Sequence, residues 1–135
     1  MTVEQTIRDS GIEQSLLELV KIRASQINGC AYCIDMHWTD ARRHGESEQR
    51  LSMLSAWRES SLYSSRERAA LAWTESLTHV AETGAPDEDY ETFAAAFTEA
   101  EQVQISLQIA AINFWNRLQV GVRAVPASEA KRHAA

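Results

Sequence analysis

The sequence predicts an all-α protein. Hydrophobic residues recur at helical spacing along the chain, no stretch shows the apolar–polar alternation of a strand, and only 5 glycines and 2 prolines occur in 135 residues. This length is enough for one domain with a substantial core and too short for two comfortable ones. We therefore expect a short lead-in over residues 1–11, one helical domain over residues 12–123, and a flexible C-terminal tail over residues 124–135.

The first two expected helices form a hairpin. The first covers residues 12–27, where apolar side chains share one face, and Asn28–Gly29 ends it because glycine readily adopts the left-handed conformation found after a helix. The second runs from about Cys30 to His44 and closes at Gly45. Two helices joined by so short a turn pack as an antiparallel or sharply angled hairpin.

Three further helices are expected in the middle of the chain. Residues 46–58 have helical spacing, and Ser60–Ser61 ends this segment. Ser64 and Glu67 form a capping-box pattern that opens the next helix, which runs to about Gly84. Pro86 is expected in the first turn of a helix that continues to about residue 97.

The longest helix is expected from a second capping box, Thr98 with Glu101, to about Arg123. One apolar stripe along it consists of Val103, Leu107, Ala110, Phe114 and Leu118. A second apolar set widens this stripe and consists of Ile105, Ile109, Ile112 and Trp115. A helix this apolar is buried on several sides, either at the centre of the domain or in a subunit interface.

The net charge and the N-terminal sequence argue against several classes of partner and location. The net charge of −6 and the pI near 5.2 argue against nucleic acid or an anionic membrane as the main partner. The N-terminus lacks the basic-then-apolar pattern of a signal peptide, and no apolar run approaches the length of a membrane span. We expect a cytoplasmic protein, a compartment in which a Cys-x-x-Cys pair is more often catalytic or metal-binding than structural.

The stretch Cys30-Ala-Tyr-Cys33-Ile-Asp-Met-His37 holds both cysteines of the chain. At about 100° per residue, the two thiols and the imidazole fall within roughly a 60° arc of one helix. This pattern is typical of a redox or a metal site. As a zinc site it offers three ligands, with no second Cys or His pair to complete a structural set.

A family resemblance extends well beyond this motif. The segments LELVKIRASQINGCAYCIDMH (residues 17–37), GESEQRL (45–51), WRES (57–60), RERAALA (66–72) and INFWNR (112–117) closely resemble the core of the alkylhydroperoxidase D-like (AhpD-like) proteins. These belong to the carboxymuconolactone decarboxylase superfamily. The resemblance covers roughly residues 12–123, with motif order and spacing intact.

The resemblance implies an all-helical fold built on the hairpin and assembled into a homo-trimer or hexamer. It also implies a peroxidase without a bound cofactor, whose redox-active disulfide joins Cys30 and Cys33 and whose site includes Glu18 and His37. In the family pattern Cys33 meets the peroxide, Cys30 resolves the intermediate, and a thiol or dithiol of unknown identity regenerates the pair. Two departures stand out: Tyr32 replaces a histidine of some members, and the N-terminus is shorter than in many relatives.

Physical reasoning leaves the attacking cysteine open. Cys30 lies nearest the helix N-terminus, where thiolates are favoured, whereas Cys33 lies one turn below His37. Glu18 is roughly 16 Å back from the turn and His37 roughly 12 Å beyond it, so an antiparallel hairpin brings them level. The expected relay runs from Glu18 through His37 to the thiol, with a solvated Glu18 as the alternative.

Three other functions remain alternatives at this stage. The first is a decarboxylase like the one that names the superfamily, because one fold can carry several chemistries. The second is a non-enzymatic assembly module whose cysteines sense oxidants. The third is zinc binding through Cys30, Cys33 and His37.

Overall fold

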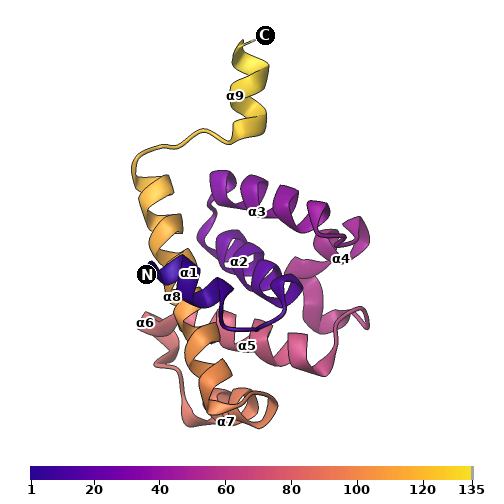
Figure 1. The fold of residues 1–135 in the computed structure, drawn as a ribbon, viewed down its shortest axis with the longest axis vertical. Coiled ribbons are helices and arrows are strands. Elements are labelled where there is room, and N and C mark those ends of the chain that lie inside the picture. The colour runs from indigo at the N-terminus through magenta and orange to yellow at the C-terminus, as the bar shows by residue number, and fades with distance from the viewer. Residues whose placement is uncertain (135) are drawn as a thin grey trace.

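The structure is a computed structural model that describes residues 1–134. Within that range it consists of helices joined by turns and contains no strand, which confirms the predicted all-α class (Figure 1). The elements in chain order are α1 (Val3–Arg8), α2 (Gln14–Asn28), α3 (Ala31–Arg43), α4 (Glu48–Ser52), the 3₁₀ helix η1 (Leu54–Glu59), α5 (Ser65–Thr78), α6 (Val80–Thr83), α7 (Asp87–Ala96), α8 (Glu99–Gly121) and α9 (Ala127–Ala134). None of these helices combines the length and the apolar character that crossing a bilayer requires.

Helices α2 and α3 form the predicted hairpin. Gly29 ends α2 in the left-handed conformation, with φ of 66°. The N–H of Cys30 then donates to the carbonyl of Ser25 at 3.0 Å, which closes the turn tightly. Because the turn is so short, α3 runs back along α2 and the two helices pack against each other.

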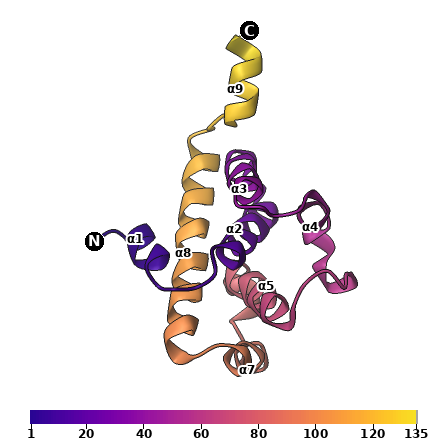
Figure 2. The same ribbon diagram turned by 45° about the vertical axis from the view of Figure 1, so that its right-hand side comes forward.

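Helix α2 lies at the centre of the fold, in contact with α3, α5 and α8 (Figure 2). Two apolar cores flank it. One lies among α1, α2, α5, α7 and α8, and includes Leu17, Trp73, Phe93 and Ile109. The other lies among α2, α3, α5 and the α4–η1 region, and includes Ile22, Leu54 and Trp57. Burial on several sides explains why α2 has so few exposed positions.

Both predicted capping boxes are present, Ser64 with Glu67 at the start of α5 and Thr98 with Glu101 at the start of α8. Two predicted helices are divided. Residues 46–58 form α4 and η1, with non-helical backbone at Ala56, and the helix that begins after Ser64 stops at Thr78 before α6. Pro86 is the N-cap of α7 rather than a residue of its first turn.

Helix α8 buries three of the four residues that were expected only to widen its apolar stripe, and the fourth, Trp115, is 40% exposed. Ile105, Ile109 and Ile112 are in the core, whereas Val103 is 63% and Phe114 60% exposed. The helices α1, α2, α3, α5 and α7 all pack on α8 and leave part of its circumference open. The face that carries Val103 and Phe114 is therefore an uncovered apolar surface of this protomer.

Both ends of the chain contain helix. Within the predicted lead-in, α1 has its own capping box and buries Ile7. Within the predicted tail, residues 127–134 form α9, which extends away from the bundle (Figure 1). The N–H of Ser128 donates to Asp35 Oδ2 at 3.2 Å and links the start of α9 to α3. Ala135, the last residue of that predicted tail, lies outside the described residues.

Candidate active site

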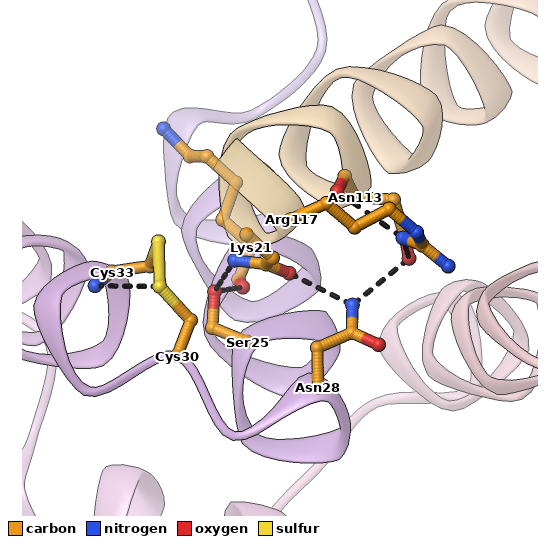
Figure 3. The surroundings of a disulfide bond; sticks show 8 residues. Lys21, Ser25, Asn28, Cys30, Cys33, Asn113 and Arg117 are labelled. Atoms are coloured by element: carbon orange, nitrogen blue, oxygen red, sulfur yellow. Dashed lines mark hydrogen bonds between the residues drawn. A yellow bond between two sulfur atoms is a disulfide. The ribbon is translucent and has the colours of Figure 1, made fainter. Parts of the chain in front are cut away.

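A disulfide joins Cys30 to Cys33 at the start of α3 (Figure 3). Cys30 is the N-cap of the helix, and its Sγ accepts the backbone N–H of Cys33 at 3.3 Å. Both residues are only 1% exposed. The left-handed turn at Gly29 thus places one sulfur at the helix N-terminus, where free N–H groups favour negative charge on it.

Glu18 and His37 lie side by side between α2 and α3. Nδ1 of His37 is 3.5 Å from Oε2 of Glu18, so the two side chains are level, as the hairpin geometry predicts. Glu18 is 3% and His37 8% exposed, and neither Oε2 nor Nδ1 has a closer partner among the described residues. The alternative of a solvated Glu18 is therefore wrong, because α3 covers this face of α2.

Two neighbours from α2 complete the surroundings of the Glu18 carboxylate. Lys21 Nζ and Gln14 Nε2 each lie 3.0 Å from Oε1, so this oxygen accepts two hydrogen bonds. Burial raises the pKa of Glu18, but the His37 interaction and the Lys21 charge outweigh it, and the pKa falls below its ordinary value of 4.5. Glu18 is thus a carboxylate at neutral pH.

Sequence reasoning missed Lys21 and Gln14. The available signal was their spacing, since they lie three residues after and four residues before Glu18 and so share its face of the helix. On a face that is buried in the structure, a lysine and an amide beside one glutamate indicate that its carboxylate stays ionised, because they supply the charge and the hydrogen bond that water would otherwise supply.

A possible metal-ligand set in this region differs from the one expected from sequence. Glu18, His37 and Asp40 offer ligand atoms that all lie within 4.8 Å of one another. The sulfurs of Cys30 and Cys33 bond to each other and are not available as thiolates in this state. The Lys21 ammonium beside Glu18 already supplies a positive charge and disfavours a second cation there.

A cavity of about 410 Å³ opens beside the disulfide. Cys33 and His37 line it, whereas Cys30 does not. Side chains from α1, α2, α3 and α8 form its walls. The apolar ones are Ile7, Leu17, Met36, Ala111, Ile112 and Trp115, and the polar ones include Arg8, Lys21, Tyr32 and Gln108. Of the two cysteines, only Cys33 thus borders this cavity.

A buried polar network ties the cysteine turn to α8 (Figure 3). Nδ2 of Asn28 donates to Oδ1 of Asn113 at 2.9 Å and to Oδ1 of Asn116 at 3.0 Å. Nδ2 of Asn116 donates to Oγ of Ser25 at 2.9 Å. Since the Ser25 carbonyl accepts the Cys30 N–H, this network holds the turn that positions the disulfide.

A model of the carboxymuconolactone decarboxylase family matches residues 2–76, more than half of the chain. The protein belongs to this family. An uncharacterized protein of Bacillus subtilis, YdfG, is 43% identical over 122 residues, which cover 90% of this chain and 83% of that one. The family membership confirms the resemblance stated from the sequence.

Solved structures agree on the fold. A protein of unknown function from Agrobacterium tumefaciens, described as a candidate antioxidant defence protein AhpD, has 48% identity and a TM-score of 0.89 over 92% of this chain and 85% of its own. An uncharacterized peroxidase-related protein from Silicibacter sp. TM1040 has 21% identity and a TM-score of 0.83, over 94% of this chain and 68% of its own. The protein therefore has the AhpD-like helical fold.

Proposed function

We propose that this protein is a thiol-dependent peroxidase of the AhpD-like type. The observation that carries the proposal is the position of Cys33, which lines a cavity together with His37 while the Glu18 carboxylate lies beside that imidazole. A thiol, a base and a carboxylate that orients the base are the parts that an activated nucleophile requires.

In the reduced protein, His37 accepts the proton of the Cys33 thiol, from which it is separated by one helical turn. The ionised Glu18 orients the imidazole. Lys21 and Gln14 hold the carboxylate in place through its other oxygen. The thiolate is the reactive species, since the neutral thiol is a poor nucleophile.

The oxidation then takes two steps. The Cys33 thiolate attacks the terminal peroxide oxygen, the O–O bond breaks, and the products are Cys33 sulfenic acid and, once the leaving alkoxide is protonated, an alcohol. The sulfur of Cys30 attacks the sulfenic sulfur, which releases water and forms the disulfide seen in the structure. A thiol or dithiol reductant returns two electrons and two protons, and the cycle needs no bound metal or organic cofactor.

The defining experiment is peroxide consumption with excess peroxide and a panel of thiol reductants. We expect the wild-type protein to turn over many times with cumene hydroperoxide, Cys33→Ser to be inactive, and Cys30→Ser to stop after one equivalent. Consumption by Cys33→Ser at the wild-type rate would refute the assignment. A wild-type protein that forms the disulfide once and then stops with every reductant would instead favour the oxidant-sensing alternative.

A further inference from the structure

The Cys30–Cys33 disulfide lies between two separate hollows of the molecule. Cys33 lines the 410 Å³ cavity described above, and Cys30 lines a second, more open hollow of about 320 Å³. Tyr32 and Gln119 line both hollows. Each cysteine thus lines a different space, although the two are only three residues apart.

The second hollow is formed by the cysteine turn and the C-terminal end of α8. Gly29 and Ala31 line it from the turn, and Val120, Arg123 and Ala124 line it from α8 and the segment that follows. A Cβ added to Gly29 would meet no atom within 4 Å, so the space beside the turn is open. A small molecule can therefore occupy the space next to the turn that carries Cys30.

Arg123 gives this hollow a positive charge. Its Nη1 donates to the carbonyl of Val120 at 3.1 Å, and it takes part in none of the ion pairs found among the described side chains. The residue also has a φ of 59°, a left-handed backbone that side chains other than glycine seldom adopt. Its remaining N–H groups are free to bind an anion.

Thiol–disulfide exchange depends on which sulfur a thiolate can reach. The attacking sulfur approaches along the S–S axis, from the side opposite the leaving sulfur. The hollow that Cys30 lines and Cys33 does not is the side from which a thiolate would attack Cys30 and expel Cys33, and in the larger cavity the two roles would be reversed. Expulsion of Cys33 returns this sulfur, as a thiolate, to its place near His37.

We propose that the hollow beside Cys30 is the binding site of the reductant, a thiol or dithiol that carries an anionic group near its sulfur. The inference rests on the proposed function, in which the disulfide is reduced in each cycle. The reductant thiolate bonds to Cys30 as the Cys30–Cys33 bond breaks. A second reductant thiol then attacks the reductant sulfur of this mixed disulfide, so Cys30 leaves reduced and the reductant leaves oxidised.

The first test maps the mixed disulfide in the wild-type protein. The disulfide form is mixed with 3-mercaptopropionate and quenched early with excess N-ethylmaleimide, and the tryptic peptide over residues 24–42 is fragmented in the mass spectrometer. We expect the mercaptopropionate on Cys30 and the maleimide on Cys33. The opposite placement overturns the proposal. Because no peroxide is used, the result stands whether or not the protein proves to be a peroxidase.

The second test fills each cavity in turn. Ala124→Phe, in the hollow beside Cys30, should slow reduction of the disulfide by at least about tenfold through displacement of the thiol, while the dithiol form still reacts with cumene hydroperoxide at the wild-type rate. Ala111→Phe, in the larger cavity, is the matched control and should show the reverse pattern. Equal slowing of both steps by both variants contradicts two separate sites.

The third test concerns charge. Arg123→Asn removes the cation, and asparagine tolerates the left-handed backbone. We expect its disulfide to react with 3-mercaptopropionate about two- to fivefold more slowly than wild type, per thiolate, and equally fast with neutral 2-mercaptoethanol. The same slowing with both thiols, or with neither, rules out an anion site at Arg123. Thermal melts check that each variant is folded.

Discussion

Nδ1 of His37 lies 3.5 Å from Oε2 of Glu18, in a position that solvent barely reaches. An ionised carboxylate held this close to an imidazole fixes the direction of the ring. The other carboxylate oxygen is already bonded to Lys21 and Gln14. These contacts hold the Glu18 side chain in this position. Removing its carboxylate should therefore first affect the orientation of the His37 ring.

We expect Glu18→Gln to lower the rate of thiol alkylation at neutral pH and to move its pH profile upward. Peroxidase turnover should fall by about 10²–10⁴-fold, the range of general-base effects. His37→Gln should resemble it, and the double variant should be little worse than either single one, because the two residues act as a unit. Wild-type alkylation and turnover in Glu18→Gln would leave His37 to act alone.

Acid should remove the stability that the Glu18 charge provides. The pKa of Glu18 is lowered in the folded protein, so its contribution is fully present above the unfolded pKa, near 4.5, and is lost as pH falls through the lower folded value. Urea unfolding of wild type and Glu18→Gln at several pH values checks this. The difference in free energy of unfolding should shrink below about pH 4.5. In Lys21→Met, which lacks one cause of the lowered pKa, this acid loss should be smaller and should be complete at a higher pH.

Asn116→Ala should destabilise the protein by about 1–3 kcal/mol, because it removes a buried acceptor of Asn28 Nδ2 and the buried donor to the Ser25 hydroxyl. Asn116 is fully buried, with 0% exposure. Arg117→Ala, on the exposed side of the same helix, is the control and should change stability by less than about 0.5 kcal/mol. Chemical denaturation measures both, and equal values would show that the network contributes little.

We expect a homo-oligomer, a trimer or a hexamer, in which a second copy of the chain covers the open face of α8. Phe114, Val103 and Val122 are each at least 60% exposed there, which is costly in water. Phe114→Glu should shift the molecular mass measured by light scattering toward the 15.1 kDa of one chain. A wild-type mass of 15.1 kDa at micromolar concentration would contradict the expectation.

The fold class, the hairpin and the capping boxes follow from local sequence, because they depend on helical spacing, one glycine and short side chain–backbone bonds. The exposed side of α8 cannot be predicted from local sequence. Both of its apolar sets have the same periodicity, and only the packing of five other helices decides that Ile109 is buried and Phe114 is open.

The burial of Glu18 shows a similar limit. A helical wheel assigns a polar face to solvent, but α2 has neighbours on several sides, so the face opposite its apolar stripe is covered by α3. The family pattern identified Glu18, Cys30, Cys33 and His37, whereas Lys21 and Arg8 at the cavity wall depend on how α1 and α2 are placed in three dimensions.

The sequence separation of three residues within the disulfide has a thermodynamic consequence. A crosslink stabilises a fold chiefly by restricting the unfolded chain, and this effect grows with the length of the loop that it closes. The loop between Cys30 and Cys33 is among the shortest possible, so the free energy of unfolding should depend only weakly on the oxidation state. The bond can therefore open and close in each cycle of the proposed reaction while the helices around it stay folded.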